Sequence, residues 1–195
     1  MSRICSINGI LYMVTLPTGR NNCINQWDLM VNYLNYQTKE LDDIIHWKNM
    51  FSWCQEREEG LCSIRGYSSA SLWYNYWFNH RGRSVGFRPV FIPLDPNTLQ
   101  PDPAILDELN NGQTISLGSF YFDNKIMHVP QDPTKDGDIP NYTPGTDISF
   151  RSLKSGYGFQ VIKLPGILIA DRVLVKNISW EDLKNLAYID LAAAE

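Results

Sequence analysis

A proline-rich segment from Pro93 to Pro103 most constrains how this 195-residue chain can fold. It places four prolines in eleven residues. Proline fixes its own backbone angle and has no amide N–H, so such a segment cannot continue a helix or lie within a central strand. The segment predicts a boundary: one domain over residues 1–93, a linker over 94–103 and a small β-rich domain over 104–191. Residues 192–195 are interpreted as possible tag residues.

The charge differs between the two halves of the chain. Residues 1–93 contain nine Lys or Arg and seven Asp or Glu, whereas residues 94–195 contain eight and fourteen. A nucleic-acid footprint needs clustered basic residues, so this balance predicts no nucleic-acid partner. No apolar run approaches the roughly 18 residues of a membrane span, and the first five residues do not begin a signal peptide. We therefore expect no membrane partner.

Local patterns predict the elements of the first half. Residues 10–16 are rich in β-branched and aromatic residues, which predicts a strand. Asn25 can cap a helix whose apolar residues follow the helical period, namely Trp27, Met30, Val31 and Leu34. A helical or irregular stretch is expected over 41–47, and residues 86–93 are interpreted as a buried final strand.

The second half is dominated by strand patterns. Residues 114–122 and 125–129 predict two strands joined by a tight turn at Asp123-Asn124. A second hairpin is expected from 159–164 and 167–175, with Pro165-Gly166 at its tip. Ser179 and Asp182 have the spacing of a helix start, which predicts a short terminal helix.

An aromatic run follows the middle of the first half. Five of the six residues from Trp73 to Phe78 are aromatic, and neither a helix nor a strand can turn all of them inward. Some must be exposed or must cover a partner. Two interpretations stay open at this point, namely that the run contacts a partner or that it packs within the molecule.

Two glycine-containing arginine motifs bracket this run. They are Arg65-Gly66-Tyr67-Ser68-Ser69 and Gly86-Phe87-Arg88-Pro89. The pair resembles the C-type-lectin-like fold in the form shared by formylglycine-generating enzymes and the variable proteins of diversity-generating retroelements. A similar pairing occurs in uncharacterised phage and prophage proteins of Gram-positive bacteria. Over residues 1–93, the resemblance implies a C-type-lectin-like N-terminal domain. Together with the strand patterns of the second half, it gives an α+β prediction with a smaller, mostly β C-terminal domain.

In the lectin-like variable proteins, the insert between these motifs displays the binding residues. Tyr and Trp supply rigid contact area, and Ser and Asn supply adaptable hydrogen bonds. The predicted contact residues are Tyr67, Ser69, Trp73, Tyr74, Asn75, Tyr76, Trp77, Asn79, Arg81 and Arg83. A guanidinium beside a glycine can reach buried carbonyl groups. A structural role is therefore predicted for the bracketing residues Arg65, Gly66, Gly86, Phe87 and Arg88.

No pattern indicates catalysis. The formylglycine-generating enzymes use a cysteine pair near the end of the fold, whereas this chain has no cysteine after Cys62. The three histidines are isolated, and the four cysteines have no zinc-ribbon spacing, so the thiols are interpreted as reduced and buried. We expect no enzyme activity, no catalytic residue, no metal site and no cofactor.

The leading hypothesis is a non-enzymatic phage or prophage module that recognises a host surface glycan or protein through the aromatic, Ser/Asn-rich loop. One alternative is an intracellular inhibitor of a bacterial defence protein, similar in action to anti-CRISPR proteins, that works by protein–protein occlusion. A further alternative is a virion structural component, for which a homo-oligomer is a possible arrangement. The expected location is accordingly the virion or the host cytoplasm.

Overall fold

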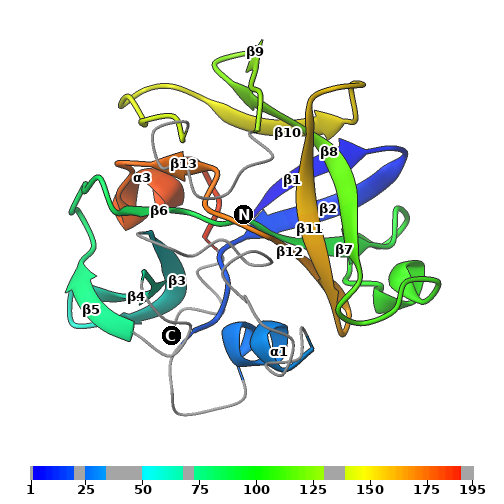
Figure 1. Ribbon diagram of the computed structural model, residues 1–195, viewed down its shortest axis with the longest axis horizontal. Helices are drawn as coiled ribbons and strands as arrows, with labels where there is room; N and C mark the ends of the chain where they lie inside the picture. Colours follow the sequence, from blue (N-terminus) through cyan, green and yellow to red (C-terminus); the bar gives the residue numbers. More distant parts are fainter. Residues whose placement is uncertain (1, 20–24, 34–49, 68–72, 130–138, 190–195) are drawn as a thin grey trace.

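The protein is built almost entirely of β-strands arranged in two sheets (Figure 1). The computed structural model describes residues 2–19, 25–33, 50–67, 73–129 and 139–189. The expected stretch at 41–47, Ser69 and the residues 192–195 lie outside this part of the chain. Among the described residues the helices are α1 (Gln26–Tyr33), the 3₁₀ helix η1 (Pro103–Leu106) and α3 (Trp180–Asn185).

The first sheet is antiparallel and curls on itself. Its described strands, in spatial order, are β1 (Arg3–Ile7), β2 (Ile10–Thr15), β7 (Val90–Leu94), β12 (Ile167–Ala170), β11 (Gly158–Leu164), β8 (Thr114–Phe122) and β10 (Ile148–Ser152), and β9 (Lys125–Ile126) pairs with β8. Side chains bridge its two ends. Arg3 donates two hydrogen bonds to Asp147, at 2.7 and 2.9 Å, and the backbone N–H of Asn8 donates to Ser152 Oγ at 2.9 Å. The curl therefore brings β1 beside β10.

The second sheet lies against one side of the first (Figure 1). Its described strands, in spatial order, are β13 (Val175–Lys176), β6 (Val85–Phe87), β3 (Phe51–Glu58), β4 (Leu61–Gly66) and β5 (Trp73–Trp77). The β3–β6 pair is parallel and the other pairs are antiparallel. This order leaves β5 at one edge of the sheet.

The α+β, C-type-lectin-like prediction is wrong. The segment from Phe51 to Gly66, for which the sequence patterns predicted no element, forms the β3–β4 hairpin. Its turn at Glu59-Gly60 has positive φ at both residues, a geometry that suits the twist of a two-residue hairpin. Local patterns did not reveal this hairpin because glutamate gives no turn signal, and the pairing of β3 with β6 depends on contacts distant in sequence.

Both sheets combine strands from the two sides of the proline-rich segment. β7 pairs with β12 in the first sheet, and β6 pairs with β13 in the second. The segment at 94–103 therefore does not sort the strands into separate sheets. Its residues fold back instead, because Asp95 N–H donates to Gln100 O and Asp102 N–H donates to Pro93 O, both at 2.9 Å.

Several local predictions are confirmed. β2 and β8 occupy the predicted positions, and Asp123-Asn124 turns with φ of 51° and 62°. α3 begins at Ser179 with a reciprocal capping box to Asp182. The predicted strand at 86–93 is instead split, because the chain leaves β6 at Phe87 and enters β7 at Val90. It changes sheets across Arg88-Pro89.

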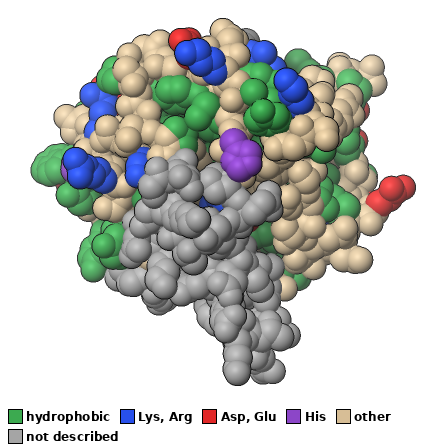
Figure 2. Space-filling view, turned by 45° about the horizontal axis from the view of Figure 1, so that its top comes forward, with side chains coloured by type: hydrophobic (Ala, Val, Ile, Leu, Met, Phe, Trp, Pro, Cys, Tyr) green, Lys and Arg blue, Asp and Glu red, His purple; other side chains and the backbone are tan. Residues whose placement is uncertain are grey.

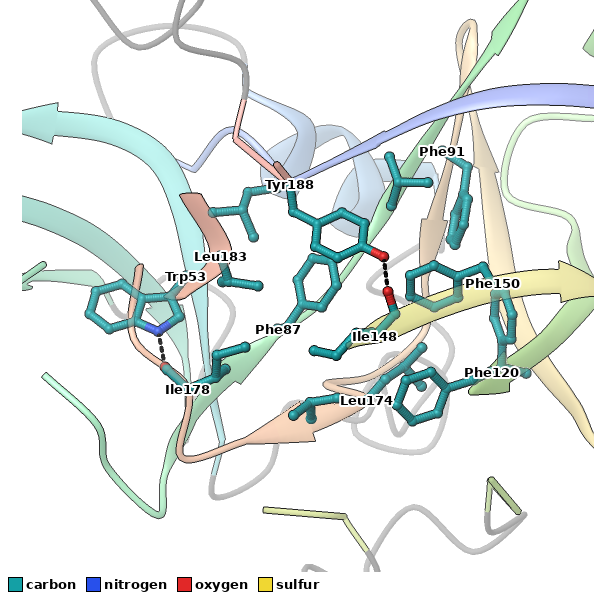
Figure 3. Close-up of a cluster of buried hydrophobic side chains, with 14 of the residues drawn as sticks. Trp53, Phe87, Phe91, Phe120, Ile148, Phe150, Leu174, Ile178, Leu183 and Tyr188 are labelled. Atoms are coloured by element: carbon teal, nitrogen blue, oxygen red, sulfur yellow. Dashed lines mark hydrogen bonds between the residues drawn. The ribbon is translucent and has the colours of Figure 1, made fainter. Parts of the chain in front are cut away.

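One aromatic cluster joins the two sheets. Phe150 of β10 lies 5.1 Å from Phe91 and 6.2 Å from Phe87, measured between ring centroids, and Phe87 belongs to β6 of the second sheet. Figure 3 shows this cluster with two of its hydrogen bonds. Trp53 Nε1 donates to Ile178 O at 2.7 Å, and the Tyr188 hydroxyl donates to Ile148 O. Trp180 and Leu183 of helix α3 belong to the same buried cluster, so strands and α3 share this core.

Candidate binding surface

Strand β5 is held on one side only. It pairs with β4 in a regular antiparallel register that sets Leu61 opposite Trp77 and Arg65 opposite Trp73. No other described strand pairs with it, and Figure 1 draws β5 on the outer side of the second sheet. The predicted contact residues Trp73 to Trp77 thus make up an edge strand.

Strand alternation divides these side chains between two faces. Tyr74 and Tyr76 lie opposite Ile64 and Cys62 on one face, and Trp73, Asn75 and Trp77 lie on the other. Ile64 and Cys62 of β4 are buried in the core, whereas their neighbours Tyr74 and Tyr76 of β5 are exposed. The exposed fractions are 52% for Tyr74, 38% for Tyr76 and 62% for Trp77. Phe78 is the member of the aromatic run that turns back and packs against the core.

Two ring contacts extend the aromatic area beyond β5. Phe51 stacks on Tyr67, with centroids 5.0 Å apart, and meets Tyr74 edge-on at 5.9 Å. Tyr76 lies 4.2 Å from the ring of His80. Tyr67 is 36% exposed and has a φ of 81°. Hydrophobic side chains protrude at the left of Figure 2, on the side where Figure 1 places β5. We call the set Tyr67, Trp73, Tyr74, Asn75, Tyr76 and Trp77 the β5 surface.

The open edge also presents backbone groups. Phe78 N–H donates to Gly60 O at 3.2 Å, so residues 60 and 78 form a hydrogen-bonded pair. Such pairs alternate along an antiparallel ladder. The pairs of Tyr76 and Tyr74 with β4 are therefore hydrogen-bonded, and the N–H and C=O groups of Trp73, Asn75 and Trp77 point away from β4. The C=O of Trp77 accepts a bond from His80 N–H at 3.0 Å.

The turn after β5 carries the remaining predicted contact residues. Asn79, Arg81 and Arg83 are exposed. Arg81 makes two 2.7 Å hydrogen bonds to the carboxylate of Asp182, so its guanidinium fastens the turn to α3. Burial alone would raise the pKa of the Asp182 carboxyl, but bonds from Arg81 and Ser179 outweigh burial and lower it. Arg81 therefore positions the turn as well as lying at its surface.

The bracketing residues are buried beneath the surface. Arg65 donates to Gly19 O at 2.7 Å from β4. Arg88 is completely buried, and it donates to Ser52 Oγ in the second sheet at 2.9 Å and to Ala170 O in the first at 3.0 Å. A Cβ at Gly86 would collide with Val173 and the Val175 carbonyl, so only glycine fits there. Phe87 fills the shared core.

No protein-family model, curated protein or solved structure matches this chain.

Sequence reasoning did not select Phe51 and His80, which extend the ring contacts of the β5 surface. Neither lies inside the aromatic run, so only the strand pairing and the turn reveal them. Within the part of the chain that the structure describes, no three His, Cys, Asp or Glu side chains gather as a metal-binding group. No described helix has the length and apolar character of a membrane span. The β5 surface offers ring faces, an amide and outward backbone groups.

Proposed function

We propose that this protein is a non-enzymatic recognition module and that the β5 surface is its contact surface. The observation that carries the proposal is the concentration of exposed aromatic area. Among the described residues, eight large hydrophobic side chains are exposed, and four of them lie on or beside β5: Tyr67, Tyr74 and Tyr76, and Trp77 on the opposite face of the strand. Clustered exposed rings are typical of interaction sites rather than of ordinary surface, where such residues are scattered singly.

Hydrogen bonds hold β5 in place, and a rigid strand suits a recognition role. β5 is hydrogen-bonded to β4, and Asn75 Oδ1 accepts a 3.1 Å bond from Ser63 Oγ. The strand is thus held before any partner arrives, which reduces the entropy lost on binding. Tyr and Trp side chains have few rotatable bonds and combine an apolar ring with a polar group, so they bind at a low entropic cost.

The proposed partner is a glycan or protein on the surface of a Gram-positive host cell, as the sequence hypothesis states. Ring faces can cover the apolar side of a sugar or of a protein, and Asn75 and Asn79 can hydrogen-bond to polar groups beside them. The exposed Arg83 adds a positive charge that suits an anionic surface polymer.

The test is binding of labelled protein to intact Gram-positive cells. Tyr74→Ala/Trp77→Ala removes two exposed rings, and Leu99→Ala/Leu153→Ala removes two exposed apolar side chains far from β5 as a matched control. We expect the first double variant to bind at least about tenfold more weakly, since truncating a central contact residue costs roughly 2 kcal/mol or more. We expect the control to bind like the parent.

Equal binding by both double variants would contradict the proposal. If the parent protein binds no cells, the surface-recognition form is wrong. Capture of a defence protein that depends on Tyr74 and Trp77 would then support the alternative of an intracellular inhibitor.

A further inference from the structure

The sequence of β5 reads the same in both directions. Trp73-Tyr74-Asn75-Tyr76-Trp77 is symmetric about Asn75. Two copies of such a strand, placed antiparallel with Asn75 opposite Asn75, present identical residue types to each other at every position. This is the condition for an interface with two-fold symmetry, in which one surface contacts the same surface of the second copy.

The backbone of β5 fits the same arrangement. The N–H and C=O groups of Asn75 point away from β4, as do those of Trp73 and Trp77. With the two-fold axis at Asn75, each Asn75 N–H faces the Asn75 C=O of the second copy. Trp73 then lies opposite Trp77 of that copy in the next hydrogen-bonded pair. The central pair is the best placed, because the Trp77 C=O already accepts a bond from His80.

Side-chain pairing across this axis is favourable. Each Trp73 would neighbour a Trp77 on one face, and each Tyr74 would neighbour a Tyr76 on the other. Aromatic pairs directly across antiparallel strands stabilise a sheet. Three features with which proteins protect edge strands are missing from β5: residues 73–77 contain no charged residue and no proline, and the ladder with β4 has no bulge.

We propose that two copies of this chain pair through their β5 edges and form a continuous ten-stranded sheet from their two second sheets. The inference rests on the proposed function in one respect, that the β5 surface is made for contact. Pairing would place the exposed rings of both copies side by side, so a repetitive partner such as a surface polymer would meet two binding surfaces at once.

The small area of the interface predicts a weak dimer. As an upper limit, complete loss of the remaining exposure of Tyr74, Tyr76 and Trp77 would bury only roughly 300 Å² per copy, given about 150–250 Å² for a whole aromatic side chain, and pairing that leaves ring faces open to a partner buries less. The total is well below the roughly 1,200 Å² of a stable interface. We therefore expect a reversible dimer that is populated at about 10–100 µM, in the range of weak complexes.

A charge exchange at the two-fold axis tests the pairing. Asn75→Lys and Asn75→Asp each place like charges opposite each other, and each variant alone should dimerise at least about tenfold more weakly than the parent. An equimolar mixture places Lys opposite Asp and should recover association. Sedimentation equilibrium between about 5 and 500 µM measures all three samples, a range that brackets the expected dissociation constant. Asn79→Lys and Asn79→Asp, in the exposed turn beyond the strand, are the matched controls and should associate like the parent.

Two results would overturn the dimer. One is a parent protein that stays monomeric throughout this range, and the other is a mixture that associates no better than its two components. The cell-binding experiment separates this failure from failure of the proposed function. If the parent is monomeric but its cell binding depends on Tyr74 and Trp77, the dimer alone is refuted. If the Lys/Asp mixture recovers dimers but the Tyr74→Ala/Trp77→Ala variant binds cells like the parent, the recognition role alone is refuted.

Discussion

The Arg88 side chain connects the two sheets by hydrogen bonds. Its guanidinium bonds to Ser52 in one sheet and to Ala170 in the other, and its carbon Cζ lies 4.9 Å from the ring centroid of Trp27. Burial lowers the pKa of this arginine to about 9. A buried cation is tolerated here because hydrogen bonds and the nearby Asp171 offset the loss of water.

We expect Arg88→Met to lower the free energy of unfolding by about 3 kcal/mol, because it leaves the Ala170 carbonyl and the Ser52 hydroxyl without this donor. Urea denaturation at pH 7 measures the loss. Arg83→Met, which removes an exposed arginine of the same segment, should change stability by less than about 0.5 kcal/mol. A loss below about 1 kcal/mol for Arg88→Met would mean that its bonds only balance the cost of burying it.

The buried phenol of Tyr12 makes the free energy of unfolding decrease at alkaline pH. Burial raises the pKa of its phenol from 10.0 to about 12, so the folded state keeps the proton in a range where the unfolded state loses it. Stability that is fully present below pH 10 is therefore lost as the pH rises toward 12. Burial also raises the pKa of Cys5 and of Cys62 to about 12, which adds to the loss from about pH 9 upward.

We expect Tyr12→Phe to lose about 1 kcal/mol less stability than the parent between pH 8 and pH 11. Urea denaturation of both proteins at the two pH values provides the comparison. Equal losses in the two proteins would show that the Tyr12 phenol keeps an ordinary pKa in the folded state.

At the scale of elements, turn residues decide where strands reverse. Asn8-Gly9, Glu59-Gly60 and Asp123-Asn124 all have positive φ at both residues. Asn, Asp and Gly adopt this conformation readily, whereas Glu does so at a cost. Asp123-Asn124 was predictable for that reason, and Glu59-Gly60 was not, because glutamate gives no turn signal.

We expect Glu59→Asn to stabilise the protein by about 0.5–1 kcal/mol, because Glu59 has a φ of 48° in the left-handed region that Asn tolerates better. Thermal unfolding monitored by circular dichroism would show the gain as a higher Tm. Glu59→Gln removes the charge but keeps a long side chain, and it should leave Tm unchanged. A gain of the same size in Glu59→Gln would assign the effect to charge instead of backbone conformation.

For β5, the sequence predicted that some aromatic residues are exposed but not which ones. The density of aromatic residues predicted that some of Trp73 to Phe78 must be exposed. The pattern could not say which ones, because that depends on the register with β4 and on β5 lying at the sheet edge. It also could not place Arg81 against Asp182, which lies 101 residues further along the chain.

At the scale of the whole molecule, the larger of two buried clusters among the described residues is shared by both sheets. Phe150 is central to it, with ring contacts to Phe87 of the second sheet and to Phe91, Phe120 and Phe159 of the first. Strands from both sides of the proline-rich segment line this core. The two sheets should therefore unfold together.

We expect Phe150→Ala to lower the free energy of unfolding by about 3–5 kcal/mol, because it leaves a cavity among these rings. Native-state hydrogen exchange should show the same decrease for amides of β11 in the first sheet and of β3 in the second. Leu153→Ala, at an exposed position just beyond β10, serves as the control. A decrease confined to the first sheet would show that the sheets unfold as separate units.

The sequence by itself determined the local features of this protein: the strands at β2 and β8, the Asp123-Asn124 turn, the Ser179 helix cap and the need to expose part of the aromatic run. These follow from residues that are neighbours in the chain. The tertiary structure alone decided that the strands form two sheets that share a core, that the chain changes sheets at Arg88, and that Trp73 to Trp77 lie at the edge of the second sheet among the described strands. The physical reason is that sheet order and register depend on side chains that meet only after folding, so two short motifs that resemble another fold could not fix them and the α+β prediction was wrong.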